Sequence, residues 1–204
     1  MKEITKVIKV YRFDELSEEA RQKACQQVGD RMTDNTFWYS DVFDLFIKQC
    51  ASYGMTIDEN DIQFSGFGSQ GDGASFTCDN IDRGKLLKSL GIKIEEKVLD
   101  YIYDVNIIRT SYRAFHEQTV HVQILIDEDA LEEEEEEGII RDINDIADTL
   151  EFKLEELKDA LCQQLYTTLR QEYDYFHSSE YVEELAYNND MLFLANGLVY
   201  DWGE

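Results

Sequence analysis

Apolar residues recur at three- and four-residue intervals from Ile139 to about Tyr173. This is the spacing of residues that share one face of an α-helix, and here it persists over many turns. A long helix with one apolar face is stabilised mainly by packing that face against a core. The pattern therefore predicts a long amphipathic C-terminal helix. Its predicted apolar face consists of Ile143, Ile146, Ala147, Leu150, Leu154, Leu157, Leu161 and Leu165.

Two further helices are predicted near the start of the chain, after an opening strand. The strand is indicated by β-branched residues between Ile4 and Val10. Ser17 stands in the position of an N-cap for a helix over about residues 16–32. A second helix is predicted from Trp38 to Tyr53, and Gly54 is placed to end it. The predicted apolar face of that helix consists of Trp38, Val42, Leu45, Phe46, Gln49 and Tyr53.

The middle of the chain predicts two β-hairpins, because apolar and polar residues alternate there between turn signals. Glycines separate the two strands of the first hairpin. A further helix around Tyr181–Leu185 and short extended pieces are predicted near the end. The predicted elements between Gly54 and the long helix are strands at 57–67 and 74–78, short helices at 82–90 and 95–103, and strands at 105–115 and 119–126.

These elements predict an α+β fold. In it, an antiparallel sheet of hairpins packs against two N-terminal helices and one long amphipathic C-terminal helix. We expect a single α+β domain over residues 1–204, because this length and a hydrophobic content of 43% suffice for one core. No stretch approaches the roughly 18 consecutive apolar residues that a spanning helix requires. Insertion into a membrane is therefore not expected.

The charge of the chain is strongly negative. It carries 44 acidic and 19 basic side chains, for a formal net charge of −25. Proteins that bind nucleic acid or anionic membranes directly present clusters of Lys and Arg, and the sequence has no such cluster. We therefore expect either a basic protein partner or a charge that only keeps the chain dissolved.

About half of this charge lies between Asp127 and Asp159, where sixteen acidic residues face three basic ones, Arg141, Lys153 and Lys158. A run of six glutamates predicts an acidic low-complexity loop at about 127–138. On the long helix the carboxylates fall opposite the apolar face. We name the following predicted partner-binding residues the acidic ridge: Glu132, Glu133, Glu134, Glu135, Glu136, Glu137, Asp142, Asp145, Asp148, Glu151, Phe152, Glu155 and Asp159.

The acidic ridge has two interpretations. Acidic side chains three and four residues apart lie about 5–6 Å from each other, which resembles in order of magnitude the phosphate spacing along one nucleic-acid strand. Phe152 near the middle of the ridge, and Tyr166 beyond it, are predicted to project outward as aromatic anchors. The alternative is that the ridge is only a solvated helix face.

A glycine-rich loop, Gly68–Gly73, is the other distinctive segment. Ser69, Gln70 and Asp72 are candidate ligand-binding residues there. The segment lacks the Lys of a phosphate-binding P-loop and is not followed by the helix of a dinucleotide-binding fingerprint. In the structural alternative, its glycines permit positive φ in a tight hairpin while Asp72 bonds its own backbone.

The sequence gives no catalytic residue, metal site or cofactor site. The histidines His116, His121 and His177 show no metal-ligand spacing, and His116 and His121 are expected to cap or pair across a hairpin. Residues 58–61 lack the ligand pattern of an EF-hand. We therefore expect a protein that is not an enzyme and uses no cofactor.

The four cysteines have no CxxC pair, and no signal peptide precedes the charged start Met1-Lys2-Glu3. Both observations favour reduced thiols and a cytoplasmic location. The cysteines are Cys25, Cys50, Cys78 and Cys162.

Three segments span most of the chain: Tyr11–Ala20, the middle motif from Phe64 through Gly73 to Phe76, and Glu172–Tyr175 with Ser178–Glu184. Together they resemble a family of uncharacterised proteins encoded by phages and prophages, some of which are labelled antitoxin-like. The resemblance implies no established activity. It does imply a setting in which small acidic proteins block host nucleic-acid enzymes such as restriction and CRISPR effectors, some by imitating DNA. The six-glutamate run and segment 91–104 depart from the family pattern.

Charge and resemblance together predict an acidic, phage-derived interaction protein in the cytoplasm of an infected or lysogenic bacterium. It would inhibit a host defence or nucleic-acid-processing protein by covering a basic, nucleic-acid-binding surface, in the anti-CRISPR or anti-restriction manner, with DNA mimicry as one way to do so. Two alternatives stay open. One is a small-ligand or nucleotide-signal binding protein, or an enzyme, that uses the loop Gly68–Gly73. The other is an antitoxin that neutralises a protein toxin; the oligomeric state is open in each case.

Overall fold

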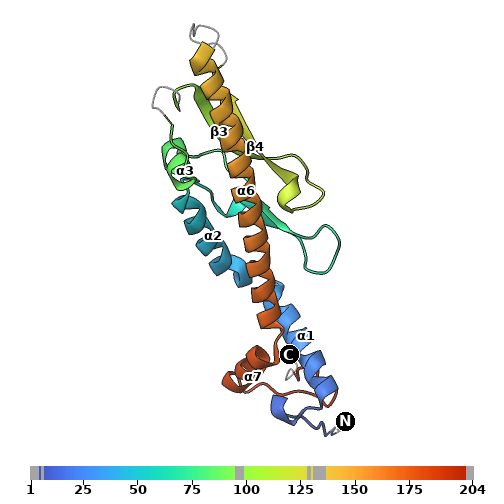
Figure 1. Cartoon of the computed structure of the whole chain (residues 1–204). Helices are drawn as coiled ribbons and strands as arrows, with labels where there is room; N and C mark the ends of the chain where they lie inside the picture. The colour runs from blue at the N-terminus through green and yellow to red at the C-terminus, as the bar shows by residue number, and fades with distance from the viewer. Residues whose placement is uncertain (1–4, 6, 95–98, 128–129, 131–136, 201–204) are drawn as a thin grey trace, which may run out of the picture. The chain divides into compact units, whose positions relative to one another are not determined.

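The computed structural model describes residues 5, 7–94, 99–127, 130 and 137–200 (Figure 1). Its fold is α+β, as predicted, with antiparallel hairpins and a long C-terminal helix. The contacts within the chain divide it into two compact units: unit 1 comprises Met1–Ser40 and Leu169–Glu204, and unit 2 comprises Asp41–Thr168. The single domain over residues 1–204 stays a prediction.

Unit 1 is helical. Its longest helix, α1, begins where the Ser17 hydroxyl accepts a hydrogen bond from the Ala20 N–H at 3.3 Å, so the predicted N-cap is confirmed. Ser178 caps α7 in the same way, through the Tyr181 N–H at 3.1 Å. The elements of unit 1 are η1 (Phe13–Glu15), α1 (Glu18–Thr33), η2 (Thr36–Tyr39) and α7 (Ser179–Asn188), together with the last turns of α6 (Glu137–Phe176).

The core of unit 1 forms where η1, α1, α7 and the segment around Phe193 meet. The rings of Phe13 and Phe193 lie edge to face with their centroids 5.9 Å apart, an arrangement that aromatic pairs prefer. The buried cluster consists of Phe13, Leu16, Ala20, Ala24, Cys25, Val28, Val182, Ala186 and Phe193.

The predicted opening strand is wrong for the part that the structure describes, residues 5 and 7–10. Only Tyr11 pairs, in a single antiparallel bridge with Phe193. Phe193 also bridges Val199, because the chain turns back at Gly197, whose φ is +87°. Because of this turn, the segment around Phe193 offers the N-terminal segment only one bridge, at Tyr11. Residues with high β-propensity do not form a strand unless they pair with a neighbouring strand.

Unit 2 contains both predicted hairpins, which form two separate two-stranded antiparallel sheets. Ile62 pairs with Phe76 in the first sheet, and Val105 pairs with Ile124 in the second. A bridge between Cys78 and Ile107 connects them. The elements of unit 2 are α2 (Ser40–Ser52), η3 (Glu59–Asp61), β1 (Ile62–Phe64), β2 (Ala74–Phe76), α3 (Arg83–Ser89), β3 (Ile102–Arg109), η4 (Glu117–Thr119), β4 (Val120–Ile126) and α6 up to Thr168.

Two short helices predicted in this region have different outcomes. The helix at 82–90 is confirmed as α3, and the Asp82 carboxylate caps it by accepting the Lys85 N–H at 2.9 Å. The helix predicted at 95–103 lies partly outside the described residues, at 95–98. Its end is wrong, because β3 begins at Ile102.

The long helix α6 confirms the prediction from the apolar repeat. Within unit 2 the N-terminal half of α6 crosses the β3–β4 hairpin and bonds to β4, and α2 and α3 lie to the left of α6 in Figure 1. Each fully buried aliphatic side chain contributes about 1.5–3 kcal/mol relative to exposure. The buried face of α6 in unit 2 consists of Ile143, Ala147, Leu150, Leu154, Lys158, Leu161, Cys162 and Leu165. Within the described ranges, no helix has the length and apolar character needed to cross a bilayer.

The apolar face of α2 is rotated from its predicted position. Phe43 and Cys50 are buried, whereas Leu45 is 65% exposed. The prediction counted Trp38 in this face, but Trp38 lies in the 3₁₀ turn η2 and α2 begins only at Ser40, so Trp38 does not mark the buried face of α2. Gly54 does end the helix as predicted, with a φ of +91°.

The rotated face of α2 predicts different outcomes at adjacent residues. Phe46 is 4% exposed and its ring lies 5.2 Å from that of Phe76, so Phe46→Ala is expected to lower the free energy of unfolding by about 3–5 kcal/mol. The matched change Leu45→Ala is expected to cost below about 1 kcal/mol, because that side chain is exposed. Urea denaturation measures both, and equal losses would contradict the observed face.

Candidate partner-binding surface

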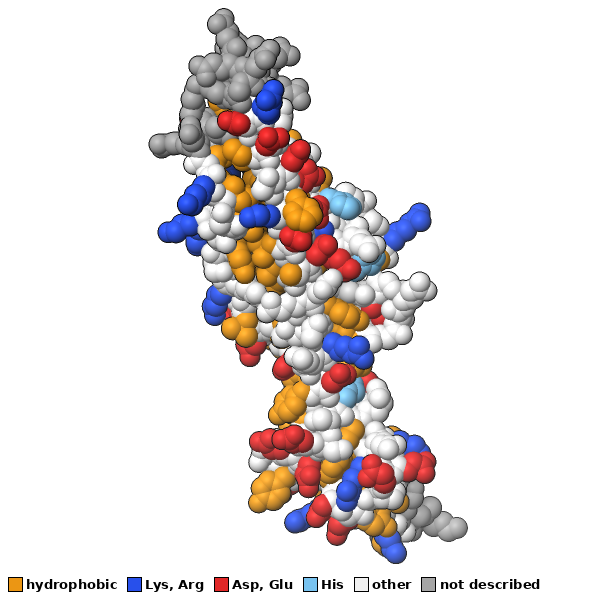
Figure 2. All heavy atoms as spheres, viewed as in Figure 1, with side chains coloured by type: hydrophobic (Ala, Val, Ile, Leu, Met, Phe, Trp, Pro, Cys, Tyr) orange, Lys and Arg blue, Asp and Glu red, His pale blue; other side chains and the backbone are white. Residues whose placement is uncertain are grey.

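The outer face of α6 carries the described helical part of the acidic ridge. Asp142, Asp145, Asp148 and Glu151 are exposed, and the Phe152 ring among them is 63% exposed. Glu156, one turn beyond Phe152, is also exposed. We name these six residues the acidic face. Figure 2 shows acidic side chains gathered over this part of α6 around hydrophobic surface.

The carboxylates of the acidic face are not neutralised by ion pairs with described residues. Among the described residues, no ion pair involves Asp142, Asp145, Asp148 or Glu151. The nearby Lys153 donates to the Leu90 carbonyl at 3.1 Å, at the end of α3. This cation is therefore directed to the scaffold of unit 2.

Glu155 and Asp159 have a different role from the rest of the ridge, because both pair with the buried Lys158. The Lys158 ammonium lies 2.5 Å from Glu155 Oε2 and 2.8 Å from Asp159 Oδ1. It also donates to the carbonyls of Val120 at 2.9 Å and Glu117 at 3.1 Å. Lys158 is 2% exposed, so two carbonyl acceptors and the charges of two carboxylates replace the water that it gives up.

This cluster joins α6 to β4. The second Glu155 oxygen accepts the Val122 N–H at 2.8 Å, and His121 Nδ1 lies 3.8 Å from it. Burial alone would raise the pKa of Glu155, but hydrogen bonds from Lys158 and Val122 outweigh burial and hold that pKa below its ordinary value. Burial likewise opposes the charge of Lys158, yet the hydrogen bonds to Asp159 and Glu155 raise its pKa.

Lys158 has a structural role that was not predicted from the sequence, where it is only one of three cations in an acidic segment. The signal was its position. Lys158 follows the buried Leu154 by four residues and precedes Leu161 by three, so it belongs to the apolar face of α6. A lysine in the middle of a buried stripe must find acceptors.

The other predicted parts of the ridge are placed as follows. The predicted acidic loop at about 127–138 falls mainly on residues outside the described ranges, Glu132–Glu136 included, and Glu137 begins α6. Tyr166 is not an outward anchor. Its hydroxyl donates to the Gly66 carbonyl at 3.2 Å, and its ring lies 5.6 Å from that of Phe67. Tyr166 therefore holds the glycine-rich loop to α6.

The glycine-rich loop uses Asp72 for its own backbone. Asp72 Oδ2 accepts the N–H groups of Gly68 at 2.9 Å and Ser69 at 2.6 Å, as the structural alternative predicts. Gly71 has a φ of +92°. The side chains of Ser69 and Gln70 are exposed. Asp72 is thus engaged in the turn, and a ligand role for Ser69 and Gln70 stays a prediction.

Each of the three histidines contacts different residues. His116 caps η4 by accepting the Gln118 N–H at 3.2 Å, and His177 lies 3.3 Å from Asp30. Within the ranges that the structure describes, no three His, Cys, Asp or Glu side chains are grouped so as to hold a metal ion.

The four cysteines are buried and unpaired. Burial raises the pKa of the Cys78 thiol to about 11 and that of Cys162 to about 12. It raises the pKa of Cys50 further. These thiols are core side chains and poor nucleophiles.

In a comparison with known protein families, residues 38–179 match a family described as Domain of unknown function (DUF8835). No curated protein and no solved structure matches the chain. The matched range contains the whole acidic face, the Lys158 cluster and the glycine-rich loop.

Removal of the buried ammonium is expected to destabilise the protein. Lys158→Met leaves Glu155, Asp159 and two carbonyls without their donor, so we expect a loss of about 3 kcal/mol in the free energy of unfolding. Lys48→Met, which changes an exposed lysine of α2, is the control and should stay within about 0.5 kcal/mol. Denaturant titration measures both.

The pH dependence of that loss has a defined sign. The Glu155 pKa is lowered from 4.5, so its contribution is complete above pH 4.5 and disappears as the pH falls through the lower folded-state value. The Lys158 pKa is raised from 10.5, so its contribution is complete below pH 10.5 and disappears as the pH rises through the higher value. The difference between wild type and Lys158→Met should shrink outside this window. A constant difference down to strongly acidic pH would contradict the ion pair.

The glycine-rich loop offers a matched pair of substitutions. A Cβ on Gly73 would lie 2.5 Å from His116 Cβ and 2.8 Å from its Cα, whereas a Cβ on Gly68 meets nothing within 4 Å. Gly73→Ala is expected to cost about 1–3 kcal/mol through overpacking, and Gly68→Ala little. Thermal unfolding distinguishes them, and equal stability of the two variants would refute the close approach of His116.

Proposed function

The chain belongs to the DUF8835 family, a domain of unknown function, and we propose that it acts as an interaction protein whose acidic face covers a basic surface on a nucleic-acid-processing protein. The observation that carries this proposal is the separation of roles along α6. Glu155 and Asp159 form ion pairs with Lys158, while Asp142, Asp145 and Asp148 stay exposed.

The first argument is energetic. Like charges three and four residues apart on a helix destabilise it by about 0.2–0.5 kcal/mol per pair. Asp142, Asp145 and Asp148 follow one another at three-residue spacing, without an ion pair among the described residues. A cationic partner would relieve this repulsion, and the relief would make the free energy of binding more favourable.

The second argument is the exposed ring of Phe152. Asp148 precedes it by one helical turn and Glu156 follows it by one turn. Large aromatic side chains and arginines are enriched at the centres of interfaces. An arginine of the partner could stack on the Phe152 ring while its charge meets Asp148 and Glu156. Phe152 and its two flanking carboxylates would therefore select a partner by the position of an arginine as well as by charge.

The third argument concerns the class of partner. Surfaces that bind nucleic acid present Lys and Arg at the spacing of phosphates, and carboxylates about 5–6 Å apart can occupy the same cations. On this proposal the protein inhibits by occlusion. Its resemblance to phage and prophage proteins favours a host defence protein, such as a restriction or CRISPR effector, as the target in the bacterial cytoplasm.

The test compares the binding of the wild type with that of a variant altered on the acidic face. The immobilised wild-type chain is expected to retain a nucleic-acid-binding protein from a bacterial lysate at about 50 mM salt and to release it at about 200 mM salt or on addition of duplex DNA. The variant Asp145→Asn, Asp148→Asn, Phe152→Ala should lose this retention. Mass spectrometry of the retained proteins gives the readout.

A matched control of equal charge separates the acidic face from net charge. The variant Asp44→Asn, Asp79→Asn removes two exposed carboxylates of the same unit outside α6 and should retain the partner. Equal loss in both variants would show that charge alone is responsible. Failure of the wild type to retain any DNA-releasable protein would overturn the proposal.

A further inference from the structure

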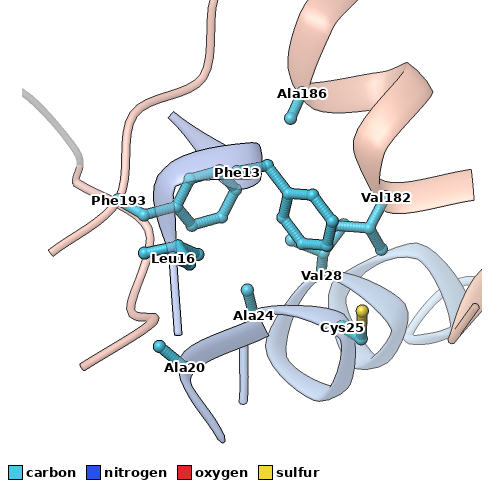
Figure 3. Close-up of a cluster of buried hydrophobic side chains, with 9 residues drawn as sticks. All are labelled: Phe13, Leu16, Ala20, Ala24, Cys25, Val28, Val182, Ala186 and Phe193. Atoms are coloured by element: carbon cyan, nitrogen blue, oxygen red, sulfur yellow. The ribbon is translucent and has the colours of Figure 1, made fainter. Parts of the chain in front are cut away.

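Unit 1 contains a groove of about 790 Å³ between η1 and the end of α7. Its apolar lining includes Phe13, Ala186 and Met191, of which the first two are buried. Figure 3 shows the Phe13 ring of η1 pointing toward Val182 of α7, with Ala186 one turn farther along that helix. The groove therefore has an apolar floor continuous with the core of unit 1, and it lies outside the range matched by the family.

The groove is closed on one side by the turn after α7. Asp190 adopts a φ of +51°, a left-handed conformation that Asp tolerates better than most residues. The Met191 N–H then bonds back to the Ala186 carbonyl at 2.9 Å. This hydrogen bond ends the helix and brings Met191 to Ala186.

The rim of the groove is acidic. Asp14, Glu183 and Asp190 line it together with a single cation, Arg12. Within the described part of the chain, no ion pair involves these three carboxylates. The negative end of the α7 dipole lies at the same place. An apolar floor with an acidic rim fits a ligand that is both apolar and cationic.

The chain itself contains a segment of that chemistry. Residues 5–10 read Thr-Lys-Val-Ile-Lys-Val, with two lysines and no acidic residue in a chain of net charge −25. Val7 is 87% exposed and Ile8 is 42% exposed. Among the described residues, the backbone of 5 and 7–10 makes no hydrogen bond to other backbone groups. Of this segment, the described residues 5 and 7–10 do not line the groove of their own chain.

We propose that the groove binds residues 5–10 of a second copy of this chain, with Val7 and Ile8 on the apolar floor and Lys9 against the carboxylates of the rim. Reciprocal exchange of the two segments closes a two-fold symmetric dimer. Direct pairing of the two segments with each other is the less favourable arrangement. An antiparallel pairing centred between Val7 and Ile8 places Lys6 opposite Lys9, and like charges directly opposite are destabilising.

The test is charge exchange in the full-length chain, read by sedimentation equilibrium at about 0.15 M salt, where repulsion between copies is screened beyond about 8 Å. The wild type is expected to dimerise reversibly. Lys9→Glu and Glu183→Lys are each expected to weaken dimerisation by about tenfold or more, because each homodimer then contains two mismatched contacts. Lys48→Glu, an exposed change in unit 2, is the control and should leave the dimer intact.

Mixing supplies the decisive step. A heterodimer of Lys9→Glu with Glu183→Lys contains two groove contacts. In one, the unchanged Lys9 of one chain meets the unchanged Glu183 of the other. In the other, the introduced glutamate meets the introduced lysine. Both contacts are then matched in charge. Association should return in the equimolar mixture and in the double variant. A wild type that stays monomeric at every concentration, or a dimer that neither substitution weakens, would overturn the proposal.

Discussion

The ammonium of Lys158 is buried inside unit 2, where it forms ion pairs with two carboxylates of its own helix and donates to two backbone carbonyls around η4 and β4. A buried cation tolerates few positions of its acceptors, since any shift leaves charge uncompensated in a poorly polarisable interior. This constraint fixes the rotation of α6 against the β3–β4 hairpin. Asp142, Asp145, Asp148, Glu151 and Glu156 are consequently directed to solvent.

Other cations of this acidic protein also bind internal oxygen atoms. Arg83 donates to the carbonyls of Leu99 and Ile102, and Arg109 donates to the buried Ser75 hydroxyl at 3.1 Å while it lies over the Phe115 ring. With Lys153 and Lys158, these cations tie loops, strands and helices of unit 2 to one another. These cations bind internal oxygen atoms and so do not neutralise carboxylates on the surface of unit 2. The surface is therefore more negative than it would be if these cations were exposed.

The sequence predicts those elements whose determinants are local. The apolar repeat of α6 gives its extent within a few residues, and Ser17 marks a helix start because a hydroxyl before an apolar series caps free N–H groups. Alternation gives both hairpins, although the strands of the first are shorter than predicted. Asp72 likewise serves its own loop, since a short acidic side chain in a turn binds neighbouring N–H groups.

The sequence does not predict features that depend on distant partners. The segment before Tyr11 has strand-forming residues but meets only a short partner at Phe193. Leu45 is exposed on α2, because the tertiary contacts of this helix, such as that between Phe46 and Phe76, cover the neighbouring face. Tyr166 is engaged by a loop that lies a hundred residues earlier in the sequence. In the acidic ridge, Glu155 belongs to the scaffold and Asp148 to the surface, a difference that helical spacing alone does not reveal.

The burial of the cysteines gives each unit a natural chemical reporter. Cys25 lies in the core of unit 1, and Cys50, Cys78 and Cys162 lie in unit 2. Alkylating reagents attack the thiolate, which forms readily only after a core opens to water. The modification time at each cysteine therefore records how often its own unit opens, and the two units can be followed side by side in the unlabelled natural chain.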